Sequence, residues 1–158
     1  MILIGNKELF AIEYKMTDTD KAMGYSKIWL GSQSLGTSED LIYLRGYLAA
    51  GLQEIANSSE LNIKLMNKED LYKFFIAKIN NSHNPEQLKY SIRSFGTFCD
   101  DFIIFSFIYD DEINIVWKLL SNNTPFLDLN NQSLRINYFK ISKNEYFKVL
   151  NELINRIF

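Results

Sequence analysis

Acidic side chains border the most apolar part of the sequence, and they are the first candidates for chemistry. Asp100 and Asp101 precede an eight-residue aromatic and β-branched run, and Asp110, Asp111 and Glu112 follow it. Acids around a hairpin are common in metal-dependent nucleases. On a hairpin, however, eight strand steps of about 3.3 Å, or about 26 Å, separate Asp101 from Glu112, so these groups do not share a metal ion. Neither group has a histidine or lysine beside it, and solvated strand ends are the favoured interpretation.

The chain offers one thiol and one imidazole, on Cys99 and His83. Nucleophilic catalysis requires the two groups within hydrogen-bonding distance, which the sequence does not show. No Gly-x-Ser-x-Gly turn is present to fix a serine nucleophile. A structural cysteine beside the strand and a histidine in an asparagine-rich loop are favoured, and we expect no catalytic residue.

One loop begins like a calcium-binding loop, with Asp18 and Asp20 two residues apart. Ala22 stands at the third ligand position, and Met23 stands where the sharp turn requires glycine. We therefore interpret this segment as a solvated connection.

The segment 31–38 has the glycine spacing of a phosphate-binding loop between a strand and a helix. Thr37 stands at the position of the lysine that would neutralise the phosphates, so the motif is weak evidence for nucleotide binding. We interpret Ser38 instead as a helix cap, with Glu39 and Asp40 in the first turn. No cofactor or metal site is expected anywhere in the chain.

The apolar runs around the acids predict a β-hairpin. Residues 102–109 are too few for an amphipathic helix, and residues 113–119 alternate. A two-residue turn at Asp110 and Asp111 is expected, although Asp-Asp is a fair rather than a favoured turn and a longer loop is the alternative. The expected pairs are Tyr109 with Glu112, Phe107 with Asn114, Phe105 with Val116 and Ile103 with Lys118. The face assigned to the core holds Phe102, Ile104, Ile108, Ile113, Ile115, Trp117 and Leu119.

The opposite face of the first strand is also apolar, because it carries Ile103, Phe105, Phe107 and Tyr109. Apolar surface of this size requires a cover. A helix of the same chain is the default, and a partner protein or a second copy is the alternative.

The remaining periodicities place helices between two groups of strands. The expected strands are 9–16, 25–31, 34–36, 125–129 and 133–141. The first expected helix covers 39–56, with a buried stripe of Leu41, Leu44, Leu48, Leu52 and Ile55. A second helix runs from an Asn67 cap to the loop at 80–84, and a short helix starts at Pro85. A terminal helix follows the capping box of Ser142 and Glu145, with Tyr146, Leu150, Leu153 and Ile157 on one face. This order predicts a single α+β domain over residues 1–158 with a largely antiparallel sheet, since a βα alternation is absent.

Composition favours a soluble cytoplasmic protein. A chain of 158 residues with 47% hydrophobic residues can bury a sizeable core, and one cysteine fits a reducing compartment. The net charge of -2 gives no reason to expect nucleic acid or a membrane as partner. No secretory signal or membrane span is expected.

Charge is distributed unevenly along the chain. Residues 94–117 contain five acids and no lysine, arginine or histidine. A surface of this kind suits a basic protein partner, because complementary charge raises the association rate and rejects wrong partners.

Several segments resemble the immunity proteins of bacterial polymorphic toxin and contact-dependent growth inhibition systems. The resemblance rests on residues 10–14, on Tyr25 to Leu30 leading through Gly36, on Ser94 to Phe102, and on Ile115 to Lys118. It implies a small cytoplasmic protein that binds the C-terminal domain of a cognate toxin and blocks it, and it transfers no catalytic or binding residue. We hypothesise that Asp110, Asp111 and Glu112, with Asp100 and Asp101, contact that toxin, which is basic and a nuclease in many such systems.

Two other classes stay open at this point. A hydrolase or nuclease would require the acids, or Cys99 and His83, to converge in a cleft. A self-associating structural domain would use the aromatic face of Phe105 and Phe107, and the sequence does not decide between monomer and homodimer.

Overall fold

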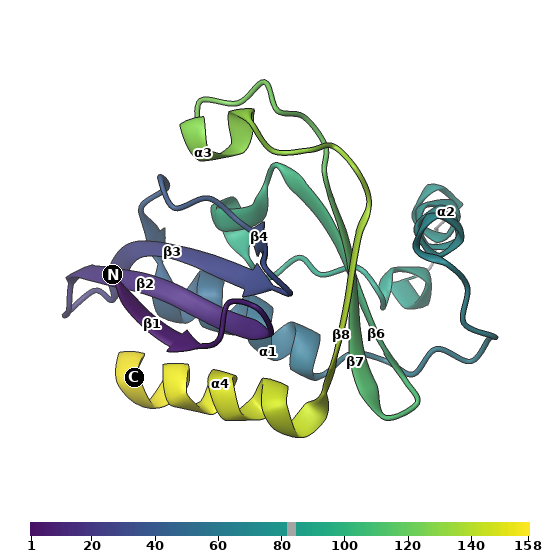
Figure 1. Ribbon diagram of the computed structural model, residues 1–158, viewed down its shortest axis with the longest axis horizontal. Helices are drawn as coiled ribbons and strands as arrows, with labels where there is room; N and C mark the ends of the chain where they lie inside the picture. The colour runs from purple at the N-terminus through teal and green to yellow at the C-terminus, as the bar shows by residue number, and fades with distance from the viewer. Residues whose placement is uncertain (82–84) are drawn as a thin grey trace.

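Two antiparallel sheets and the helices around them make up the fold in a computed structural model, which describes residues 1–81 and 85–158 (Figure 1). The first sheet contains β1 (Ile2–Gly5), β2 (Phe10–Asp18), β3 (Met23–Leu30), β4 (Gln33–Leu35) and β5 (Ile42–Tyr43). The second contains β6 (Phe102–Tyr109), β7 (Glu112–Leu119) and β8 (Asn137–Ser142). The α+β class and the antiparallel pairing are therefore confirmed, with the strands divided over two sheets.

Most helical segments of the described chain are short, and only α2 and α4 exceed two turns. They are the π-helix η1 (Leu44–Ala49), α1 (Ala50–Ala56), α2 (Lys68–Asn80), the 3-10 turns η2 (Pro85–Leu88) and η3 (Gly96–Cys99), α3 (Leu127–Asn130) and α4 (Lys143–Ile157). Asn67 and Ser142 cap α2 and α4, where their side chains accept hydrogen bonds from the backbone N–H groups of Asp70 and Glu145. Both caps are confirmed predictions.

The central hairpin has the predicted register throughout, from Ile103 opposite Lys118 to Tyr109 opposite Glu112. Asp110 and Asp111 have φ values of 52° and 60°. Positive φ at both turn positions matches the right-handed twist of the strands, so the two-residue turn is confirmed and the longer loop is wrong. The predicted core face packs in the larger apolar cluster, which holds residues of both sheets, α1 and α4.

The second face of β6 is covered by the chain itself. Figure 1 shows α2 beside β6 and β7, on the side away from the first sheet. The ring of Phe75 lies 5.0 Å from Phe105 and 5.6 Å from Phe107 between centroids. Phe105 and Phe107 are buried, so this face is not available to a second copy and the self-association hypothesis loses its proposed surface.

Helix α4 closes the other side of the core. Its buried residues include the four predicted from spacing: Tyr146, Leu150, Leu153 and Ile157. The Tyr146 ring stacks on Phe10 at 4.7 Å, and its hydroxyl donates to the carbonyl of Leu52 at 2.8 Å. One side chain thus joins α4 to both β2 and α1.

One predicted helix is right over residues 44–56 but wrong in its start, and one predicted strand is wrong in type. The first helix begins at Leu44 rather than residue 39, because Ile42 and Tyr43 pair with Gly24 and Met23 of β3. Leu41 consequently lies outside the buried stripe and is 47% exposed.

The other error concerns residues 125–129. These were expected to form an edge strand, and residues 127–130 form the helical turn α3 instead. The strand predicted over 133–141 begins later, at Asn137, and the short N-terminal strand β1 was not predicted.

Replacing Phe75 by Ala tests the cover over β6. We expect a loss of about 3–5 kcal/mol in the free energy of unfolding, because the substitution opens a cavity against Phe105 and Phe107. Urea unfolding measures this loss, and the exposed Lys73→Ala on the same helix should change stability by less than about 0.5 kcal/mol. Equal effects of the two substitutions would contradict the packing role of Phe75.

Candidate functional site

The five predicted acids lie in two groups at opposite ends of the hairpin. Asp110, Asp111 and Glu112 form the tip, where Tyr109 pairs with Glu112. Asp100 and Asp101 lie at the other end, where the Asp101 carbonyl accepts a hydrogen bond from the N–H of Leu120 at 2.9 Å. The structure therefore does not bring them into one site, as expected from strand length.

Lysines partly neutralise the tip. Lys143 Nζ lies 2.9 Å from Asp111 Oδ1, and Lys140 Nζ lies 3.9 Å from Glu112 Oε1. The hydrogen bond that Lys143 donates to Asp111 raises the pKa of Lys143 above its ordinary value. Lys140 belongs to β8 and Lys143 to the first turn of α4. The spacing along the sequence does not indicate that they reach the tip.

The other end has no such compensation. Within residues 1–81 and 85–158, neither Asp100 nor Asp101 forms an ion pair. Burial and the neighbouring charge of Asp100 raise the pKa of the Asp101 carboxyl. Negative charge is therefore concentrated here without a partner in the described chain.

Nothing in the described residues supports the enzyme hypotheses. Among them, no group of three or more histidine, cysteine, aspartate or glutamate side chains could hold a metal ion. Burial and the charge of Asp100 raise the pKa of the Cys99 thiol well above its ordinary value, which disfavours the thiolate. His83 lies outside the described residues, so its position relative to Cys99 is not tested.

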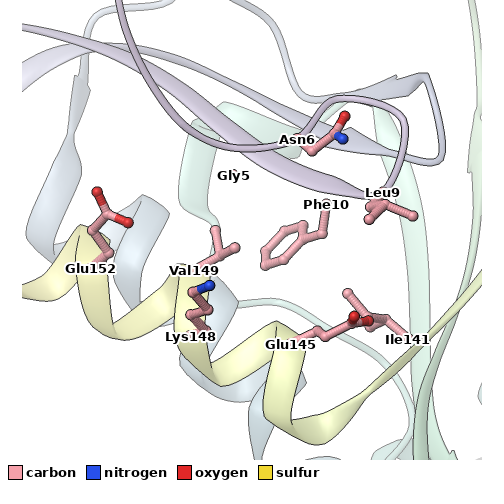
Figure 2. A pocket seen from close by; sticks show the side chains of 9 residues that line it. All are labelled: Gly5, Asn6, Leu9, Phe10, Ile141, Glu145, Lys148, Val149 and Glu152. Carbon is pink, nitrogen blue, oxygen red and sulfur yellow. The ribbon is translucent and has the colours of Figure 1, made fainter.

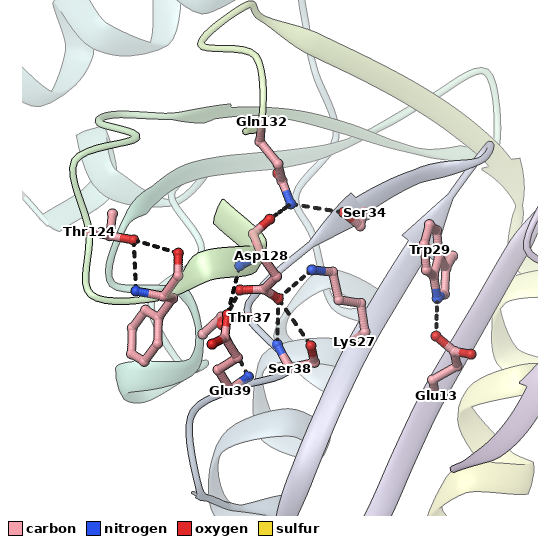
Figure 3. A network of polar contacts seen from close by, with 11 residues as sticks. Glu13, Lys27, Trp29, Ser34, Thr37, Ser38, Glu39, Thr124, Asp128 and Gln132 are labelled. Atoms are coloured by element: carbon pink, nitrogen blue, oxygen red, sulfur yellow. Dashed lines mark hydrogen bonds and ion pairs between the residues drawn. The ribbon is translucent and has the colours of Figure 1, made fainter. Parts of the chain in front are cut away.

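A polar network that the sequence did not predict centres on Asp128 of α3 (Figure 3). Its carboxylate accepts hydrogen bonds from Lys27 Nζ at 2.6 Å, from Thr37 Oγ1 at 2.7 Å and from the Ser38 backbone N–H at 2.9 Å. The Ser38 hydroxyl also donates to it, at 3.1 Å. Ser38 therefore binds Asp128 and does not cap a helix, which corrects the interpretation of segment 31–38.

The loop that resembles a phosphate-binding loop thus holds an anion after all, and the anion is a carboxylate of the same chain. Burial alone would raise the pKa of Asp128, but the hydrogen bonds from Lys27, the Ser38 N–H and Thr37 outweigh it and hold the pKa well below its usual range. The Lys27 side chain is only 9% exposed. A buried lysine requires a carboxylate partner. For a lysine within a predicted strand, this requirement was the signal that could have pointed to such a pair.

Two further contacts tie α3 to the first sheet. Glu39 accepts a hydrogen bond from the Asp128 backbone N–H at 2.6 Å, and Gln132 donates to Ser34 at 3.1 Å. The network fixes the whole connection between β7 and β8 against β3 and β4, which gives it a structural role.

A groove of about 380 Å³ lies between α4 and the turn that joins β1 to β2 (Figure 2). Phe10, Ile141 and Val149 contribute apolar lining, and Glu145, Lys148 and Glu152 contribute charges. Because acids and lysine alternate along α4, the groove has no strong preference for the charge of a ligand.

Comparison with solved structures finds the same fold in another protein. The structure resembles a solved structure of CdiI from Burkholderia dolosa AUO158, with a TM-score of 0.61, 14% sequence identity, and coverage of 98% of this chain and 99% of that chain. No curated protein matches the sequence.

The family is shown by the sequence itself. A family model, Immunity protein 42, matches residues 1–156, and the chain belongs to this family. Its function is accordingly that of an immunity protein, which neutralises a toxin. No helix in the described part of the chain is long and apolar enough to cross a membrane.

Asp128→Asn tests the network. The substitution leaves the buried Lys27 without a counter-ion, and we expect stability at pH 7 to fall by about 3 kcal/mol, near the lower end of what breaking a buried pair costs. Because the folded pKa of Asp128 is depressed, its contribution is present above the pKa of the unfolded carboxyl, about 3.9, and is lost as the pH falls below that value. Urea unfolding at several pH values should therefore show the difference between the two proteins shrinking in acid.

The exposed Asp20→Asn is the matched control for Asp128→Asn, since it removes one carboxylate from a loop. It should leave stability at pH 7 unchanged. A pH-independent difference between wild type and Asp128→Asn would contradict the role of the charge.

Proposed function

We propose that this immunity protein neutralises its toxin by direct, non-catalytic binding to the toxin's C-terminal domain. The supporting observation is membership of the Immunity protein 42 family over residues 1–156. The chain acts as a single domain in the cytoplasm, and neither nucleic acid nor a membrane is its partner. The likeness in fold to a CdiI protein supports a system of the contact-dependent growth inhibition type.

The toxin domain is a basic nuclease in this proposal. The support is the uneven charge of the hairpin, where five acids have no basic residue between residues 94 and 117. A basic active-site face on the toxin would be attracted to these acids, and complementary charge accelerates encounter without requiring many direct contacts.

Co-expression with the C-terminal domain of the large protein encoded immediately upstream tests neutralisation. We expect the domain alone to stop growth, and co-expression to restore growth and yield a stable complex on size-exclusion chromatography. Cleavage of nucleic acid by the domain, and its loss on adding one equivalent of this protein, tests the nuclease assignment. An active, folded domain that is neither bound nor inhibited would overturn the proposed function for that pair.

Both acidic groups are proposed toxin contacts, and the tip is the easier to alter. Asp110→Asn with Asp111→Gly removes two charges and keeps the turn, because Asn-Gly favours the positive φ angles that these positions adopt. We expect the association rate to fall about three- to tenfold at low salt, with an unchanged dissociation rate. Surface plasmon resonance at two salt concentrations measures both rates.

Glu8→Gln with Glu69→Gln is the matched control, since it removes two exposed acids elsewhere on the surface. An association rate that falls equally in both double variants would assign the effect to net charge. Unchanged association and dissociation rates in the hairpin variant would contradict the assignment of the tip as a toxin contact.

A further inference from the structure

Two tyrosines and a leucine form an exposed apolar surface around the start of η1, termed here the tyrosine surface. Leu41 is 47%, Tyr43 41% and Tyr47 36% exposed. Ile42 and Leu44 between them are buried, so the exposed side chains all point away from the core. The π-helical segment that carries Tyr47 belongs to a rare class of helix that frequently occurs at functional sites.

Glycines hold both tyrosine rings in place. A Cβ atom on Gly46 would lie 2.3 Å from the Tyr43 ring, and one on Gly96 would lie 2.7 Å from the Tyr47 ring. Each ring therefore rests directly on backbone, and the two rings meet edge to face with centroids 6.5 Å apart. Because packing already restricts the rotation of both rings, a partner that contacts them causes only a small further loss of side-chain conformational entropy.

A hollow of about 210 Å³ is lined in part by Gly96, the residue on which the Tyr47 ring rests. Phe95, Phe102 and Ile104 line it with apolar atoms, and Arg93 and Asp100 contribute its charges. This volume suits one long side chain of a partner.

Carboxylates outnumber cations at this end of the hairpin. The Glu54 carboxylate accepts hydrogen bonds from the backbone N–H groups of Arg93 and Ser94, at 2.9 and 2.8 Å, which brings a third acid to the Asp100 and Asp101 end of the hairpin. Three acids and one arginine thus lie at this end of the hairpin, and of these four Asp100 and Arg93 line the hollow. In the described chain none of these four side chains forms an ion pair.

We propose that the tyrosine surface and the Gly96 hollow together form the anchor of the toxin interface, with a lysine or arginine side chain of the toxin inserted in the hollow. This inference rests on the proposed function and specifies which surface performs it. The aliphatic stem of the inserted side chain packs on Phe95 and Phe102, and its cationic head lies at Asp100. Rigid tyrosines are among the residues that dominate binding energy in protein interfaces.

The tip and the anchor are separate surfaces. At the start of α4, Lys143 pairs with Asp111 of the tip. At the other end of α4, the ring of Phe158 lies under the guanidinium of Arg45, which stands between Tyr43 and Tyr47 in the sequence. Helix α4 has 15 residues, so about 22 Å separates its two ends. The tip variant consequently reports on steering, and the anchor variants report on how long the complex lasts.

Tyr47→Ala and Asp100→Lys test the anchor separately, with the same immobilised C-terminal domain of the protein encoded upstream as the probe. We expect Tyr47→Ala to speed dissociation about 30-fold, the size of a strong interface residue, with little change in association. Asp100→Lys places a cation at the rim and should weaken binding about tenfold or more. Asp100 is exposed, so this variant keeps the proposal testable if Tyr47→Ala unfolds.

Two matched controls accompany these variants. Leu127→Ala removes a side chain that is 72% exposed on α3, and Glu8→Lys makes the same charge change as Asp100→Lys at a distant turn. Neither should alter the dissociation rate, and thermal unfolding of all four variants verifies that they are folded.

The outcomes separate the two proposals. Wild-type binding with unchanged dissociation in both anchor variants would overturn the anchor and leave neutralisation intact. Failure of the wild type to bind an active toxin domain would overturn the proposed function, and the anchor with it. A wild-type dimer in light scattering that Tyr47→Ala converts to monomer would assign the surface to a second copy instead.

Discussion

The structure depends on one requirement, that a hairpin apolar on both faces has to be covered on both sides. The first sheet, α1 and α4 cover one face of β6 and β7, while α2 covers the other through Phe75. The first sheet packs against one face of the hairpin and does not extend its plane, so the strands divide over two sheets. The same requirement removes Phe105 and Phe107 from the surface, so any partner has to bind elsewhere.

Polar contacts over long sequence separations then fix the parts that apolar packing leaves loose. The Lys27–Asp128 pair holds the β7–β8 connection on the outer side of the first sheet, and the Tyr146 hydroxyl links α4 to Leu52 of α1. Both contacts satisfy buried groups that would otherwise carry a desolvation cost of about 1–3 kcal/mol each. The loop at Thr37 and Ser38 has the donors of an anion site, and it uses them to bind the fold's own carboxylate.

An inhibitor that works by binding needs a stable scaffold and a surface that rejects wrong partners. Charge is distributed accordingly along the hairpin. At the tip, lysines of β8 and α4 reduce the field of Asp111 and Glu112, whereas the opposite end retains uncompensated acids beside exposed aromatic rings. Acids that form no ion pair cost little while they are solvated, and they become favourable only when a basic partner arrives.

The sequence by itself determined the features that local periodicity encodes: the hairpin register, the two-residue turn, the caps at Asn67 and Ser142, and the buried face of α4. These follow from side-chain alternation and from hydrogen bonds only a few residues apart. The sequence failed where distant segments compete for the same backbone, as at Ile42 and Tyr43, which β3 recruits into a strand ahead of the helix. Only the tertiary structure decided that Asp128 fills the loop at Ser38, that Lys143 reaches Asp111, and that Tyr47 rests on Gly96. Each of these pairs joins residues more than thirty positions apart, and no local pattern records which long-range partner a polar or aromatic side chain will meet.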